Sequence, residues 1–132
     1  MAGLHFEFVS PETVLFSGDV DQVDLPGSEG DLGVLPGHAP MVTTLRPGIV
    51  TIMREGNRES VVVVGGFAEM GPAGLTVLAD RAGTREDFDL ELLASDIGDI
   101  EEDVADSKDD AERDKLARRL EQLRALQAAL TR

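Results

Sequence analysis

Short runs of apolar residues, separated by glycine, proline and small polar residues, fill about the first two-thirds of the chain. Runs of this length, bounded by turn-forming residues, are typical of β-strands. They extend over residues 4–9, 13–16, 22–25, 41–45, 48–53, 60–64, 67–70 and 75–78. Because many short strands with glycine and proline turns need a second layer to cover their apolar faces, the pattern predicts a β sandwich. The unbroken apolar run at 61–64 predicts a strand that is covered on both faces.

The pattern changes after residue 87, where apolar residues recur at alternating steps of three and four, as on one face of a helix. The first stretch carries Leu90, Leu93, Ile97, Ile100 and Val104, and the second carries Leu116, Leu120, Leu123 and Leu130, with Gln127 between the last two. Between the stretches, Asp109 followed three residues later by Glu112 is typical of a helix N-cap. We therefore expect an antiparallel hairpin of two amphipathic helices.

Glycine and proline mark the boundary between the two patterns. Thirteen of the fourteen glycines and all six prolines precede residue 85. The predicted fold class is therefore β followed by α, with a β-sandwich domain at 1–84 and a helical hairpin at 85–132. Because two short helices bury too little apolar surface to offset the entropy of ordering them, the hairpin is expected to depend on the sandwich or on a partner. An element with two such options is a candidate regulatory element.

Charge and composition narrow the function. The chain of 132 residues has a formal net charge of −14, no cysteine and two histidines. The negative charge argues against binding to nucleic acid or to an anionic lipid surface, so the expected partners are proteins. Without cysteine and with only two histidines, no metal site or other cofactor is expected. We also expect a soluble chain without a targeting segment, because no apolar run is long enough for a membrane span or a signal peptide.

The charge is unevenly divided between the two predicted helices. Residues 86–110 carry a balance of −11, whereas residues 111–132 carry a balance of +3. An acidic helix beside a mildly basic one experiences less self-repulsion, by roughly 0.2–1 kcal/mol for each exposed pair. The charge pattern therefore agrees with pairing of the two helices.

The segment from Pro26 to Pro40 holds three of the six prolines and four of the fourteen glycines. This density predicts two tight turns around a short apolar strand at 32–35, in a loop that presents a surface to a partner. Gly27, Gly30 and Gly33 resemble a phosphate-binding loop only superficially, because the Gly-Lys-Ser/Thr ending is missing.

The segment resembles the signature of the ε subunit of the rotary F-type ATP synthase. Further similarity lies in Val9-Ser10-Pro11-Glu12, Leu15-Phe16-Ser17-Gly18, Leu45-Arg46-Pro47-Gly48, Gly65-Gly66-Phe67 and Val77-Leu78-Ala79-Asp80. The resemblance covers about two-thirds of the chain. It implies a non-catalytic β sandwich in the central stalk, on the cytoplasmic face of the bacterial inner membrane. There the subunit would couple the γ subunit to the membrane c ring without any cofactor.

Individual positions follow from the resemblance. Ser10, His38 and Thr43 match positions that face the γ subunit, whereas Gly30 and Asp31 match a loop tip that meets the c ring. A carboxylate at that tip can accept hydrogen bonds from Arg or Gln of the ring. Taken without the family, Asp31 is interpreted as an ordinary turn aspartate.

The hairpin departs from some relatives that bind ATP through Ile/Leu-Asp-x-x-Arg-Ala. Asp89 remains here, but Leu92 and Leu93 replace the arginine and the alanine, so ATP sensing is not expected. In some bacterial relatives the hairpin also extends toward the catalytic α and β subunits and inhibits ATP hydrolysis. The candidate inhibitory contacts in this chain are Arg113, Arg118, Arg119 and Arg124. The acidic first helix would oppose such an extension, so only weak inhibition is expected.

Two other classes of function remain open on the sequence. The first is a protein-binding module whose sandwich is a scaffold and whose hairpin fits the groove of an unrelated partner. The second, more remote, is a hydrolase that brings His38 together with a serine and an acid, although no serine lies in a nucleophile elbow.

Overall fold

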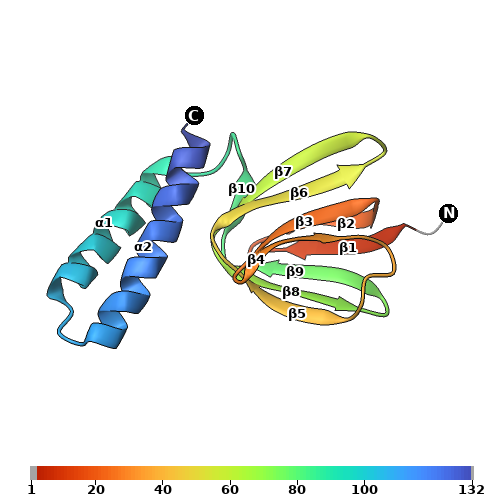
Figure 1. Ribbon diagram of the computed structural model, residues 1–132. Helices are drawn as coiled ribbons and strands as arrows, with labels where there is room; N and C mark the ends of the chain where they lie inside the picture. Colours follow the sequence, from red (N-terminus) through yellow and green to blue (C-terminus); the bar gives the residue numbers. More distant parts are fainter. Residues whose placement is uncertain (1–2, 132) are drawn as a thin grey trace. The chain divides into compact units, whose positions relative to one another are not determined.

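The computed structural model describes residues 3–131, which form a β unit and a helical unit (Figure 1). The first unit is Met1–Phe88 and the second is Asp89–Arg132. The strands are β1 (Leu4–Val9), β2 (Val14–Val20), β3 (Gln22–Gly27), β4 (Gly30–Val34), β5 (Met41–Leu45), β6 (Gly48–Arg54), β7 (Asn57–Val63), β8 (Gly66–Gly71), β9 (Gly74–Ala79) and β10 (Ala82–Thr84). The helices are α1 (Leu90–Asp106) and α2 (Asp110–Leu130).

The strands follow the order β10-β7-β6-β3-β5-β8-β9-β1-β2, and β4 pairs with β3 outside this path. Every pair is antiparallel except β1 with β9, which is parallel. Between β3 and β5 a single residue pair is in register, Gly27 with Leu45. The strands therefore bend into two layers around one core, as the predicted sandwich requires.

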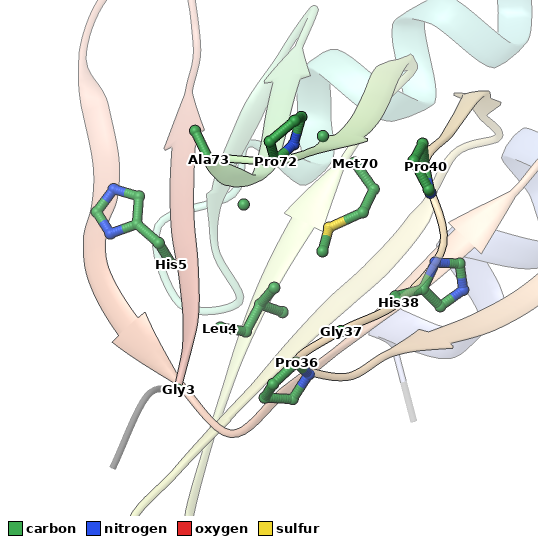
Figure 2. Close-up of a pocket in the computed structure, with 12 residues that line it drawn as sticks. Gly3, Leu4, His5, Pro36, Gly37, His38, Pro40, Met70, Pro72 and Ala73 are labelled. Carbon is green, nitrogen blue, oxygen red and sulfur yellow. The ribbon is translucent and has the colours of Figure 1, made fainter.

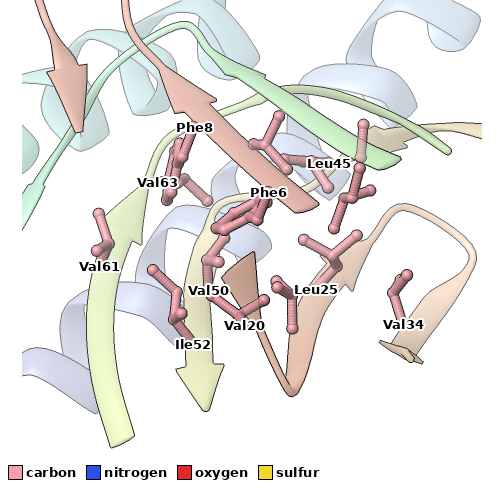
Figure 3. Packing of buried hydrophobic residues seen from close by; sticks show 14 of the residues in the cluster. Phe6, Phe8, Val20, Leu25, Val34, Leu45, Val50, Ile52, Val61 and Val63 are labelled. Carbon is pink, nitrogen blue, oxygen red and sulfur yellow. The ribbon is translucent and has the colours of Figure 1, made fainter. Parts of the chain in front are cut away.

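Alternating side chains build this core (Figure 3). In β1 the side chains of Leu4, Phe6 and Phe8 are buried, whereas His5 and Glu7 point outward. All four valines at 61–64 are buried, which confirms the prediction from their unbroken apolar run. The period of two thus fixes which face of most strands is covered.

Each predicted strand coincides with an observed one, but the boundaries shift. β2 continues to Val20, four residues beyond the predicted 13–16, and β4 is Gly30–Val34 where 32–35 was predicted. β10 was not predicted, because it has only three residues and contains no apolar run. A tight hairpin turn joins β6 to β7, with Arg54 paired to Asn57. Glu55 and Gly56 both have positive φ, as a two-residue turn of type I′ needs.

The second helix of the hairpin begins directly after the N-cap that the sequence predicts. The Asp109 carboxylate accepts from the Ala111 backbone N–H at 3.1 Å, which confirms it as the N-cap of α2. Leu93 and Ile97 of α1 and Leu120, Leu123 and Leu126 of α2 are buried, and the two helices pack against each other. The alternating steps of three and four that predicted this helix did not include Leu126. A straight helix has 3.6 residues per turn, which brings Leu126 to the same face as Leu123.

Residues 85–88 belong to the β unit, although 84 was the predicted boundary. Phe88 is buried and lies beside Gly83 of β10. The Arg81 guanidinium carbon is 5.6 Å from the centre of the Phe88 ring. The Phe88 backbone N–H also donates to the Thr84 carbonyl at 2.9 Å. This segment therefore closes the end of β10.

Candidate functional site

The segment from Pro26 to Pro40 folds around two turns, as predicted. The first turn joins β3 to β4 through Ser28 and Glu29, with Gly27 and Gly30 paired across the hairpin. A Cβ on Gly27 would lie only 2.6 Å from the Gly30 carbonyl oxygen, and Gly30 has a φ of +136°. Both glycines are therefore required by the backbone of this hairpin tip, which we define as residues 28–31.

The hairpin tip is attached to the end of β5. The Ser28 backbone N–H donates to the Thr44 carbonyl at 2.9 Å, and the two hydroxyl oxygens of these residues are 2.6 Å apart. The Arg46 backbone N–H donates to the Pro26 carbonyl at 3.0 Å, and its Nη1 donates to the Gly27 carbonyl at 2.6 Å. Nη2 of Arg46 forms an ion pair with Asp31. Three contacts of Arg46 thus reach both strands of the hairpin.

Asp31 is therefore not an isolated turn aspartate. It is the second residue of β4, its side chain is 80% exposed, and its Oδ1 is bound to Arg46. Sequence reasoning missed Arg46, which is separated from Asp31 by fifteen positions. The family motif Leu45-Arg46-Pro47-Gly48 was the one signal that could have drawn attention to it.

The second turn precedes β5 and contains Pro36 and Gly37. The His38 backbone N–H donates to the Leu35 carbonyl at 3.1 Å, and Gly37 has a φ of +83°. This is the geometry of a type II turn, with proline and then glycine at its centre. Gly33, by contrast, does not have a positive φ, so it is not the glycine on which the turn depends.

A cavity of about 350 Å³ lies between this turn, the start of β1 and the turn from β8 to β9 (Figure 2). Leu4 and Met70 lie within it and His38 lies at its rim, whereas His5 points away from it. His38 is half-buried, and its Nδ1 lies 2.8 Å from the Ala39 carbonyl oxygen. The lining is mostly apolar, and no serine lies in it beside His38. The described residues that line the cavity therefore do not bring His38 together with a serine.

The other two residues matched to a γ contact lie elsewhere on the sandwich. Ser10 directly follows β1, where its backbone N–H donates to the Thr13 carbonyl at 2.9 Å. Thr43 is half-buried in the middle of β5, and its hydroxyl donates to the Thr44 carbonyl at 3.1 Å. Because Ser10 and the cavity lie at opposite ends of β1, roughly 17 Å apart along the strand, the fold does not gather the three residues into one cluster.

An exposed row of apolar side chains crosses the outer face of four strands. In register, Phe67 of β8 pairs with Leu78 of β9, Leu78 with Val9 of β1, and Val9 with Val14 of β2. Phe67, Leu78 and Val14 are 41%, 37% and 61% exposed. We call these four residues the apolar row. It was not found from the sequence, because each strand contributes a single residue.

A charged cluster lies on the same face of β1 and β2. His5 Nε2 is 2.9 Å from Glu7 Oε1, and His5 Nδ1 is 3.2 Å from Asp19 Oδ1. The hydrogen bond to Glu7, followed by the one to Asp19, raises the pKa of His5 above its ordinary value. The Ser17 hydroxyl and then His5 lower the pKa of Glu7 by hydrogen bonding to its carboxylate.

The four candidate inhibitory arginines of α2 divide into two pairs. Arg113 contacts Asp110 and the Ser107 carbonyl, and Arg124 forms an ion pair with Glu101 of α1. Within residues 3–131, Arg118 and Arg119 form no ion pair. Among these four arginines, Arg113 and Arg124 are thus bound within the described part of the hairpin, and Arg118 and Arg119 form no ion pair there.

The start of α1 explains what Asp89 does in this chain. Its carboxylate accepts from the Leu92 backbone N–H at 3.0 Å and caps the helix. Leu92 is 42% exposed, whereas Leu93 is fully buried. The aspartate therefore has a structural role that needs no nucleotide.

Two further properties concern the described part of the chain. Its histidines, aspartates and glutamates do not form a group of three or more that could hold a metal ion. Neither α1 nor α2 is long and apolar enough to cross a membrane.

Comparison with known proteins gives close matches. The family model of the ATP synthase Delta/Epsilon chain, β-sandwich domain, matches residues 3–85. The ATP synthase epsilon chain of Maricaulis maris is 50% identical over 125 residues, which cover 95% of this chain and 94% of that protein. The ATP synthase epsilon chain of Rhodopseudomonas palustris (strain TIE-1) is 48% identical over 130 residues, which cover 98% and 96%.

Solved structures give the same fold. A chain in the cryo-EM structure of the Euglena gracilis mitochondrial ATP synthase, OSCP/F1/c-ring in rotational state 1, has a TM-score of 0.74 and 28% identity. The match covers 98% of this chain and 82% of that one. A chain in the Tetrahymena thermophila mitochondrial ATP synthase, central stalk/c-ring, has a TM-score of 0.55 over 63% of this chain and 67% of that one. At 13% identity, this second likeness concerns the fold alone.

Proposed function

The chain belongs to the family of ATP synthase epsilon chains, and from that premise we propose that it is a non-catalytic subunit of the central stalk of a proton-translocating ATP synthase. In this role it couples the γ subunit to the membrane c ring during rotation. The proposal rests on the sequence identity of 50% and 48% to two epsilon chains, each matched over nearly its full length.

The apolar row supports a role in an assembly. Exposed apolar side chains that adjoin one another across several strands are typical of a surface that a partner covers. Val42 of β5, which is 69% exposed, lies on the same face because it pairs with Glu69, two residues along β8 from Phe67. A rotor subunit that transmits torque needs such a surface, because the contact with its partner must not slip.

We assign two contact regions to the sandwich. Ser10, His38 and Thr43 face the γ subunit, and Gly30 and Asp31 of the hairpin tip face the c ring. The tip suits a contact under load, because Ser28 is hydrogen-bonded to Thr44 of β5 and Asp31 forms an ion pair with Arg46, which directly follows β5. In such a complex we place the chain, as a peripheral subunit, at the cytoplasmic face of the bacterial inner membrane.

The hairpin supplies at most a weak inhibition of ATP hydrolysis through the catalytic α and β subunits. Arg118 and Arg119 are the candidates for this contact, because Arg113 and Arg124 are already bound within the hairpin. The acidic α1 would be repelled by acidic surfaces of those subunits.

Co-purification from membranes tests the proposal. A tagged chain should retain γ when membranes are solubilised in mild detergent, and it should leave the membrane together with the soluble catalytic sector when that sector is stripped. A protein-binding module for an unrelated partner would be recovered without γ. Recovery of the tagged chain free of γ, under conditions that keep the catalytic sector intact, would refute the rotor assignment.

A further inference from the structure

Arg46, fifteen positions after Asp31, makes three contacts with the β3–β4 hairpin. Its backbone N–H is bonded to the Pro26 carbonyl, its Nη1 donates to the Gly27 carbonyl, and its Nη2 pairs with Asp31. Pro26 and Gly27 lie in β3, whereas Asp31 lies in β4. One residue directly after β5 thus contacts both strands of the hairpin.

The guanidinium group is needed for this arrangement. Its planar fork presents donors on two nitrogens at a fixed angle, so that it can bind a carbonyl and a carboxylate at the same time. A lysine has one nitrogen on a flexible stem and cannot hold the same geometry. The bond from the Arg46 backbone to Pro26 does not depend on the side chain and would survive substitution.

The side-chain contacts of Arg46 affect the orientation of the hairpin tip relative to β5 more than they affect the free energy of unfolding. The Asp31 side chain is 80% exposed and that of Arg46 is 32% exposed, and exposed ion pairs contribute little to stability. β3 and β4 are paired from Val23–Val34 to Gly27–Gly30 without any help from Arg46. β3 and β5, however, share only the pair of Gly27 and Leu45. The orientation of the tip relative to β5 therefore depends on Arg46 and on the bonds from Ser28 to Thr44.

We propose that Arg46 is a positioning residue that aims the hairpin tip at the c ring. By binding Oδ1 of Asp31 it also fixes the carboxylate, whose Oδ2 has no hydrogen-bond partner in residues 3–131. The tip then presents one oriented acceptor, which fits a hydrogen-bond donor on the ring. This inference rests on the proposed function, because it takes the ring as the partner of the tip.

Hydrogen exchange of the full chain in isolation tests the positioning directly. Arg46→Ala and Arg46→Lys should both raise the exchange rate of the Ser28 amide by about three- to tenfold, because the tip is less firmly held. The amides of Val50 and Val63, in the buried parts of β6 and β7, should keep their rates. Arg58→Ala is the matched control, since it removes an exposed arginine at another hairpin. An unchanged Ser28 amide in both Arg46 variants would overturn the inference.

Assembled ATP synthase tests the functional part. Both Arg46 variants should co-purify with γ as the native chain does, but pump about twofold fewer protons per ATP hydrolysed. Arg58→Ala should pump normally. Normal coupling in both Arg46 variants would overturn the positioning role while leaving the rotor assignment intact. A native chain that fails to co-purify with γ would refute the rotor assignment itself, and the exchange measurement would still decide whether Arg46 orders the tip.

Discussion

Glycine at position 37 has a conformation that other residues avoid. Its φ is +83°, and no atom lies within 4 Å of the place where a Cβ would be. Replacing Gly37 by Ala should therefore cost about 1–2 kcal/mol of unfolding free energy through backbone strain alone. Denaturant unfolding measures this cost.

Gly33→Ala is the control for that experiment, because Gly33 does not have a positive φ. Its added Cβ would meet only the ends of the Gln22 and Asp24 side chains, at 3.0 and 3.1 Å, and these can move. We expect a smaller loss than for Gly37. Equal losses at the two positions would show that strain is not the cause.

The cluster around His5 predicts a pH dependence of stability. The folded pKa of His5 is raised above 6.5, so its contribution is complete below pH 6.5 and disappears as pH rises through the folded value. The folded pKa of Glu7 is lowered below 4.5, so its contribution is complete above pH 4.5 and disappears as pH falls through the folded value. Stabilisation by this cluster should be greatest between pH 4.5 and 6.5.

Thermal unfolding of the native chain and of His5→Gln across this range tests the expectation. Glutamine keeps a hydrogen-bonding side chain but does not titrate. The difference in Tm should shrink above pH 6.5 and also on addition of salt, because the cluster is exposed. A constant difference from pH 5 to pH 8 would mean that His5 does not pair with Glu7 and Asp19 in solution.

At the scale of elements, the helices depend on few buried side chains. Leu123 of α2 is 1% exposed, and Leu123→Ala should destabilise the helical hairpin by about 2–4 kcal/mol. Leu92→Ala, at a residue that is 42% exposed, should cost under about 1 kcal/mol. Circular dichroism at a helical wavelength during denaturant unfolding compares them. Similar midpoints for the two variants would contradict the burial of Leu123.

The two units should also differ in amide exchange. Slow exchange is expected in β7 and β9, which contribute Val61, Val63, Leu75 and Val77 to the core. Faster exchange is expected across α1 and α2, where only five side chains of the described residues are buried. Equal protection of helices and strands in the isolated chain would refute this expectation.

At the scale of the whole molecule, two truncated chains test where the β unit ends, and one of them also tests what the helical hairpin contributes to function. A chain ending at Phe88 keeps the contact of this ring with Gly83 and Arg81, whereas a chain ending at Thr84 loses it. The longer version should be more stable by about 2 kcal/mol in denaturant unfolding. Equal stability would move the boundary back to residue 84.

The version ending at Phe88 should also assemble with γ and support coupling, because every residue assigned to γ or to the ring lies in the first unit. ATP hydrolysis by the assembled complex should change only modestly, because α1 is acidic and two of the four arginines of α2 are bound within the hairpin. A severalfold rise in hydrolysis after truncation would show that the hairpin is a strong inhibitor.

The sequence by itself determined the succession of elements in this protein. Apolar residues at a period of two become strands, those at a period near 3.6 become helices, and both signals are local. The cap at Asp109 and the turn at Glu55 and Gly56 were predictable for the same reason, since each depends on neighbours within a few residues. The assignment to a family was also within reach of the sequence, through the motif from Pro26 to Pro40.

Only the tertiary structure decided which distant residues meet. Arg46 reaches Asp31 because β3 lies between β4 and β5, and nothing local to either residue requires that order. The apolar row exists because the register of four strands places one residue from each side by side. Phe88 joins the β unit because its ring packs beside Gly83 of β10 and under the Arg81 guanidinium, neither of which the local pattern around Phe88 indicates. Strand order and register are set by the burial of the whole core, a property of all the strands together.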